Sequence, residues 1–74
     1  MNTETKLNLC IKNNPILQNP QTTIKSNYYK FVGGVRYFII YYISPFGSNY
    51  SIHREDNSKV SDYFEFHKVV TNDS

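Results

Sequence analysis

The sequence predicts a small, mainly β domain, either all-β or α+β, built on an antiparallel meander of about four to five strands. Three observations support this prediction. Residues 35–43 are β-branched or aromatic almost throughout, turn-forming residues follow at 44–49 and 56–59, and residues 6–12 alternate polar with apolar side chains. Closure into an SH3-like or OB-like partial barrel would protect the edges of such a sheet.

The chain has 74 residues, enough for one domain, which we place at residues 1–74 with residues 1–5 and 71–74 frayed. A domain of this size has a small core, and Cys10 is the single cysteine, so no internal disulfide can support it. We therefore expect self-association, with a homodimer as its simplest form.

The first expected element is a strand over residues 6–12. There the alternation places Leu7, Leu9 and Ile11 on one face. Asn14-Pro15 ends this strand and offers an N-cap followed by proline, as does Asn19-Pro20, so a short helix can lie within residues 15–32.

Residues 22–32 allow two interpretations. Ile24, Tyr28 and Phe31 have helical spacing, and Gly33 stands where a glycine would end the helix. Alternatively, residues 27–32 form a strand and Gly33-Gly34 a two-residue hairpin turn. The many β-branched and aromatic residues are mediocre helix formers and favour the strand.

Three further strands are expected at residues 35–43, 50–55 and 60–70. Apolar pairing favours a register with Ile52 opposite Phe64 on one side and opposite Tyr41 on the other. The face formed in this way is the expected core, and it comprises Ile39, Tyr41, Ile43, Tyr50, Ile52, Phe64 and Phe66.

The opposite face of this sheet carries aromatic rings interleaved with polar groups, which suits a protein partner. Its candidate binding residues are Phe38, Tyr42, His53, Tyr63, Glu65 and His67. The competing interpretation is that an N-terminal strand or helix covers this face.

A second candidate function is binding of single-stranded nucleic acid. Tyr28, Tyr29, Lys30 and Arg36 combine stacking rings with positive charge. The net charge is only +2, and acidic residues such as Glu65 near the same sheet would repel phosphates.

The residue types and their spacing give little support for an enzymatic or metal-binding function. Cys10, His53 and His67 are the only soft ligands, and none has metal-site spacing, so we expect no metal and no cofactor. His53 beside a carboxylate, or a Cys10–His dyad, could act in catalysis.

Val35-Arg36-Tyr37 followed by His53-Arg54 resembles small ribonuclease-type toxins of toxin–antitoxin systems. That resemblance implies RNA cleavage, although the segment before residue 35 is short for their usual two helices.

The chain shows no apolar signal segment and no membrane-spanning run, so we expect a cytoplasmic protein that does not act at a membrane. Its richness in Asn, Ile, Lys, Tyr and Phe is typical of an AT-rich genome. We therefore expect a non-enzymatic inhibitor from a phage or mobile element. Such an inhibitor would be of the anti-CRISPR type and would bind a larger nucleic-acid-processing enzyme.

Overall fold

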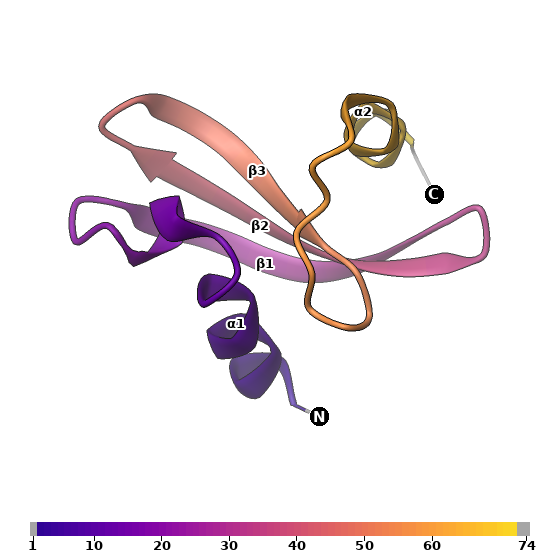
Figure 1. Ribbon diagram of the computed structural model, residues 1–74, viewed down its shortest axis with the longest axis horizontal. Helices are drawn as coiled ribbons and strands as arrows, with labels where there is room; N and C mark the ends of the chain where they lie inside the picture. The colour runs from indigo at the N-terminus through magenta and orange to yellow at the C-terminus, as the bar shows by residue number, and fades with distance from the viewer. Residues whose placement is uncertain (1, 73–74) are drawn as a thin grey trace.

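The computed structural model describes residues 2–72 and shows a small α+β fold (Figure 1). A three-stranded antiparallel sheet in the order β1-β2-β3 lies between helical segments from the two ends of the chain. The elements in chain order are α1 (Thr3–Ile11), the 3-10 helix η1 (Pro15–Gln18), β1 (Thr23–Val32), β2 (Val35–Ser44), β3 (Gly47–His53) and α2 (Tyr63–Thr71).

The β1–β2 hairpin confirms the strand interpretation of residues 27–32. Val32 pairs with Val35 across a turn made by Gly33 and Gly34, whose φ angles are 59° and 79°. Both residues need the left-handed region that glycine adopts at little cost, as expected for a tight hairpin turn. The short helix expected after Asn14-Pro15 is also present, because η1 begins at Pro15 and Asn14 caps it.

The β2–β3 hairpin has the expected faces but a different register. Ile39 pairs with Ile52 and Tyr41 with Tyr50, whereas the sequence predicted Tyr41 opposite Ile52. The connection is tighter than expected, since Ser44 already pairs with Gly47. A shift of two residues leaves every side chain on its predicted face, because the side-chain repeat of a strand is two.

The predicted strand at residues 6–12 is wrong, because this segment lies in α1. The apolar residues there fit a helix as well as a strand: Leu7, Cys10 and Ile11 follow the i, i+3, i+4 spacing of one helical face. Asn2 begins the helix by accepting a hydrogen bond from the Thr5 backbone N–H (2.8 Å).

The predicted strand at residues 60–70 is also wrong, because residues 63–71 form α2. Asp62 caps this helix by accepting from the Glu65 backbone N–H (2.8 Å). Phe66, Val69 and Val70 then pack on the sheet at i, i+3 and i+4. The described residues therefore contain three strands rather than four to five, and the SH3-like or OB-like barrel is not confirmed.

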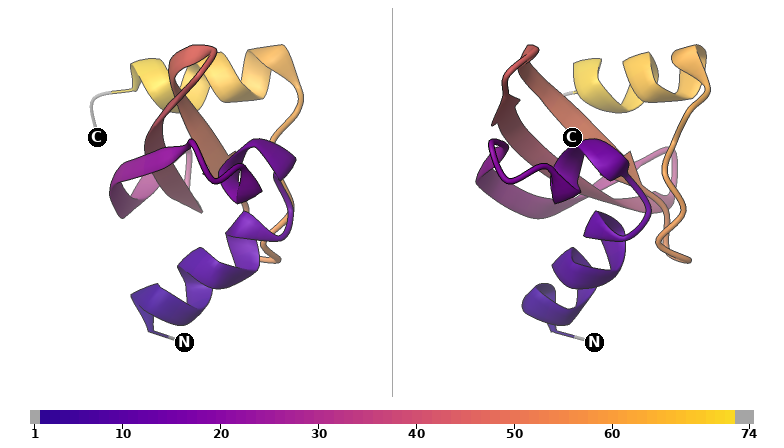
Figure 2. Two further views of the ribbon diagram at one scale, coloured as in Figure 1. Left: turned by 90° about the vertical axis from the view of Figure 1, so that its left-hand side faces the viewer. Right: turned by 60° about the vertical axis from the view of Figure 1, so that its left-hand side comes forward.

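Each face of the sheet is covered by a different helical layer. Figure 2 shows α1 and η1 on one side of the sheet and α2 on the other. Under α2, the buried cluster contains Val32, Tyr37, Ile39, Ile52, Val60 and Val69. Under α1 and η1, it contains Cys10, Leu17, Phe38, Ile40 and Tyr42. Two residues assigned to the core from sequence, Ile43 and Phe64, are exposed instead.

The expected frayed ends fall partly outside the described residues, which exclude 1, 73 and 74. Residues 3–5 form the first turn of α1, and Thr71 is the last residue of α2. Within residues 2–72, neither α-helix has the length and apolar character needed to cross a membrane.

Candidate protein-interaction site

Three of the six candidate binding residues lie inside the protein. Phe38 and His53 are fully buried and Tyr42 is nearly so, all on the face that α1 and η1 cover. The covered-face interpretation is therefore the one that the structure shows. A partner cannot contact Phe38 or His53 in this conformation.

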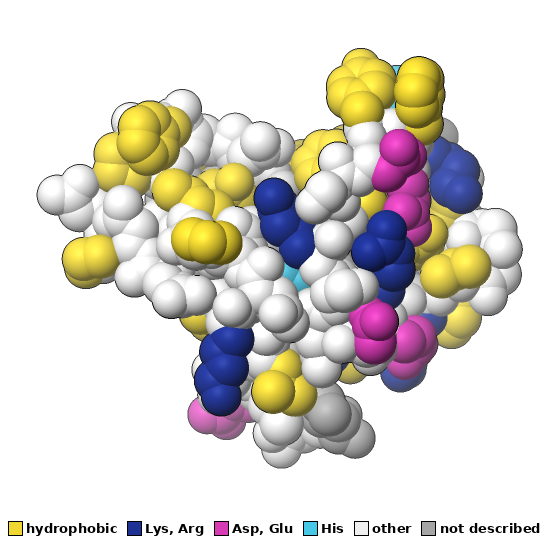
Figure 3. Space-filling view, in the orientation of Figure 1, with side chains coloured by type: hydrophobic (Ala, Val, Ile, Leu, Met, Phe, Trp, Pro, Cys, Tyr) yellow, Lys and Arg dark blue, Asp and Glu magenta, His cyan; other side chains and the backbone are white. Residues whose placement is uncertain are grey.

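The other three candidates lie on α2, together with a residue that the sequence placed in the core. Tyr63 is 69% exposed and Phe64 79% exposed. The Tyr63 ring packs edge-on against Phe64 (centroids 5.6 Å apart) and stacks on His67 (5.8 Å). We call Tyr63, Phe64 and His67 the α2 aromatic patch. Figure 3 shows hydrophobic side chains protruding above charged groups in the α2 region.

Glu65 attaches α2 to the sheet instead of belonging to this patch. Its carboxylate binds the Arg54 guanidinium (Nη2–Oε1 2.5 Å) and accepts from the Tyr37 hydroxyl (2.9 Å). The hydrogen bond from Arg54 holds the pKa of Glu65 below its usual value. Burial and the carboxylate together raise the pKa of Tyr37. The patch is therefore presented on a helix whose first turn is held in place.

The residues of the nucleic-acid alternative divide between the two faces. Tyr29 and Arg36 lie on the α1 side, where the guanidinium sits 4.4 Å from the ring centroid of Tyr29. Arg36 is also bound by Glu55 through two hydrogen bonds of 2.7 and 3.2 Å. On the α2 side, the Lys30 ammonium donates to the Val69 carbonyl (2.7 Å), and Tyr28 is half-exposed. Both cations therefore already have internal partners.

A buried polar chain connects η1 to β3. The Asn14 amide donates to Ser51 Oγ (2.9 Å), which lies 2.7 Å from His53 Nε2, and His53 Nδ1 lies 3.1 Å from the Asn57 carbonyl. Since that carbonyl can only accept, Nδ1 carries the ring proton and Nε2 accepts from Ser51. Burial lowers the pKa of His53, which agrees with a neutral ring. Because Ser51 and His53 are fully buried, this pair supports the fold and is closed to a substrate.

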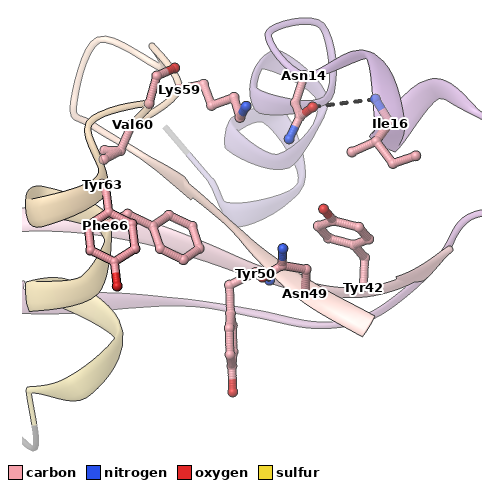
Figure 4. Close-up of a pocket in the computed structure, with 10 residues that line it drawn as sticks. Asn14, Ile16, Tyr42, Asn49, Tyr50, Lys59, Val60, Tyr63 and Phe66 are labelled. Atoms are coloured by element: carbon pink, nitrogen blue, oxygen red, sulfur yellow. Dashed lines mark hydrogen bonds between the residues drawn. The ribbon is translucent and has the colours of Figure 1, made fainter. Parts of the chain in front are cut away.

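A pocket of about 430 Å³ opens at the outer side of β3, between η1 and α2 (Figure 4). Tyr42 and Asn14 line it on the η1 side, and Tyr63 and Phe66 on the α2 side. Figure 4 shows the Lys59 ammonium pointing toward Asn14 across its mouth. Sequence reasoning missed this pocket, because its walls come from segments far apart in the chain and one of them is α2, which the sequence predicted as a strand.

The remaining candidates for chemistry are the metal-ligating side chains and the Cys10 thiol. Residues 2–72 contain no cluster of three metal-ligating side chains. Burial raises the pKa of the Cys10 thiol to about 11, so the thiol stays protonated and is a poor nucleophile.

Comparison with protein-family models, with curated proteins and with solved structures found no match to this chain. The arrangement of the side chains is therefore the basis for the functional proposals that follow.

Proposed function

We propose that this protein is a non-enzymatic protein-binding module that uses the α2 aromatic patch. The observation that carries this proposal is the exposure of Tyr63 and Phe64 side by side on a helix fastened to the sheet. Aromatic side chains are enriched among the residues that dominate binding energy, since each ring buries a large area at little entropic cost.

The fixed position of α2 adds to this argument. The Asp62 cap and the contacts of Glu65 hold the first turn of the helix, so little order has to be gained when a partner binds. More specifically, the protein would be encoded by a phage or mobile element, act in the cytoplasm and inhibit a larger nucleic-acid-processing enzyme. The composition of the chain supports that form.

Protein binding is favoured over the two alternatives by the arrangement of the cations and of His53. Arg36 and Arg54 are both engaged by glutamates, which weakens a phosphate-binding role. The residues that resemble ribonuclease-type toxins include His53 and Arg54. The first is buried and the second is ion-paired, so neither is placed to act on RNA.

The test is an affinity pull-down from a lysate of the source organism, treated or untreated with nuclease, using the wild type and two variants. Phe64→Ala removes a ring of the patch, and Phe46→Ala removes an equally exposed ring from the β2–β3 turn. We expect a protein that is retained after nuclease treatment, lost with Phe64→Ala and kept with Phe46→Ala. Capture that disappears with nuclease would overturn the proposal and support nucleic-acid binding.

A second measurement separates the same alternatives with the purified partner. Binding to an aromatic patch should change little with salt, whereas neutralisation of phosphates would make the affinity fall steeply as salt rises.

A further inference from the structure

The two edges of the sheet differ in how they are protected. On β1, a bulge interrupts the ladder between Ile24 and Ser26, and the exposed Lys25 lies at this bulge. Lysines and bulges are the usual devices that prevent a further strand from pairing with an edge. The sequence of β3, Gly47–His53, contains no charged residue and no proline. The β3 edge is therefore the unprotected one.

Part of this edge is already used by the chain itself. Lys59 forms an isolated bridge with His53, and the Val60 N–H donates to the Ile52 carbonyl (2.8 Å). The backbone N–H and C=O groups of successive residues alternate between the two sides of a strand. Those of Tyr50 and Ser48 therefore point to the same outer side as those of Ile52. The Tyr50 N–H is occupied by its neighbour, the Asn49 side chain (2.8 Å). In residues 2–72 no strand lies beside Ser48 or the Tyr50 carbonyl.

The pocket described above lies along this open edge. Phe66 lines it on the α2 side and Ile16 on the η1 side, so the edge lies between two walls. Its volume of about 430 Å³ is within the range of ligand-binding clefts. The walls suit a single extended strand.

The charge at the pocket indicates what such a strand carries. No carboxylate among residues 2–72 lies within 4.0 Å of the Lys59 ammonium, which lines the pocket and points toward Asn14 on the η1 side (Figure 4). The nearly buried Tyr42 also lines that side and can donate its hydroxyl to an acceptor. On the α2 side the walls are the rings of Tyr50 and Phe66. An alternating peptide would thus meet a cation with one side chain and rings with the next.

We propose that the free edge of β3 binds an extended segment of a partner protein by strand addition. An Asp or Glu of that segment would face Lys59, and an apolar residue would pack on Tyr50 and Phe66. Main-chain hydrogen bonds supply affinity in this mode and alternate side chains supply specificity. The inference rests on the proposed protein-binding function and extends its site from the α2 aromatic patch, through Tyr63, to the strand edge.

The test uses the full chain and a displayed library of random unstructured peptides as the probe. We expect selected peptides to alternate apolar residues with one Asp or Glu. Lys59→Glu should weaken their binding at least about tenfold, because like charges would then face each other. Lys25→Glu on β1 is the charge-matched control and should leave binding unchanged. Both lysines are exposed, so neither substitution should prevent folding.

Nuclear magnetic resonance of the complex with one selected peptide locates the binding. We expect slowed amide hydrogen exchange at Ser48 and shifts over residues 47–52 and 59–66. Shifts confined to α2 would overturn strand addition while leaving the proposed function intact. A library that yields no binder would also overturn strand addition. So would a dimer in sedimentation analysis whose interface the resonance shifts place on β3. The lysate capture that depends on Phe64 is a separate result, so failure of strand addition can be distinguished from failure of the proposed function.

Discussion

The two helical layers are attached to the same sheet by different means. On one side, the Lys6 ammonium of α1 is buried and donates to the carbonyls of Arg54 (2.8 Å) and Glu55 (3.2 Å), and Asn14 binds Ser51 in the interior. On the other side, α2 buries only Val69 completely. The first layer is thus connected through buried polar groups. The second is connected through a few apolar contacts, one partly exposed ion pair and partly buried hydrogen bonds from Tyr37 and Lys30.

This difference separates the residues that complete the fold from those available to a partner. The α1 side uses its aromatic residues as core, since Phe38 and Tyr42 are covered. The α2 side exposes Tyr63 and Phe64. Rings that look alike in the sequence therefore have opposite roles, and substitutions in the two layers should have different consequences.

The largest contrast is expected between two phenylalanines. Phe38→Ala should cost about 3–5 kcal/mol of unfolding free energy, because it leaves a cavity under α1. At roughly 0.05–0.15 kcal/mol per residue, the whole domain has only about 4–11 kcal/mol, so this variant should be largely unfolded. Phe64→Ala should stay within about 0.5 kcal/mol of the wild type. Urea unfolding measures both, and equal losses would contradict the division into core and patch.

A smaller effect is expected for the buried lysine of α1. Lys6→Met keeps the length of the side chain but removes two charge-assisted hydrogen bonds, and should cost about 1–3 kcal/mol. The matched control is Lys12→Met at the exposed C-terminal end of the same helix, for which we expect no measurable change. Thermal unfolding of both variants decides whether the polar attachment of α1 contributes to stability.

The cap of α2 provides the next test. Asp62→Ala should cost about 1 kcal/mol and reduce helical circular dichroism, because the Glu65 N–H loses its acceptor. Asp62→Asn retains a side-chain oxygen and should restore most of the stability. If the alanine variant kept its helix but lost partner binding, Asp62 would be a contact residue and not a cap.

The weakest expected effects are pH-dependent and differ between the layers. Burial lowers the pKa of His53, so the unfolded chain takes up the proton first. The neutral His53 ring therefore makes its full contribution to the unfolding free energy above about pH 6.5, which is the pKa of histidine in the unfolded chain. This contribution falls as the pH drops toward the pKa of His53 in the folded protein. Glu65 also has a lowered pKa, because Arg54 binds it, and its contribution is lost only below about pH 4.3.

Unfolding free energies measured across this range should therefore show two separate declines. Glu65→Gln should reduce the decline at lower pH, to which the lowered pKa values of Glu55 and Asp56 also contribute, and should leave the decline at higher pH. A titration of the His53 ring should give a pKa below about 6.5. A His53 pKa above that value would contradict the neutral, buried ring.

Part of the site could be read from residue types alone. The sequence predicts Tyr63 and His67 as surface residues, but it places Phe64 in the core because the strand pattern over residues 60–70 alternates the two faces. The Asp62 and Glu65 spacing is the signal that could have corrected this, since a capping residue three positions before a glutamate marks a helix start. The pocket beside β3 had no comparable signal, because its walls come from segments far apart in the chain.

The sequence by itself determined the central hairpins. Gly33-Gly34 favoured a tight turn over the alternative of a helix end. The two-residue side-chain repeat of the strands expected at 35–43 and 50–55 assigned each side chain to its face even where the register differed by two. Only the tertiary structure decided the two ends of the chain. Both end segments contain apolar residues at the two spacings. Leu7, Leu9 and Ile11 repeat every two residues, as do Phe64 and Phe66. Leu7, Cys10 and Ile11, like Phe66, Val69 and Val70, follow the i, i+3, i+4 spacing of a helix. The sheet settled the choice, because each of its apolar faces needed a cover that a helix supplies.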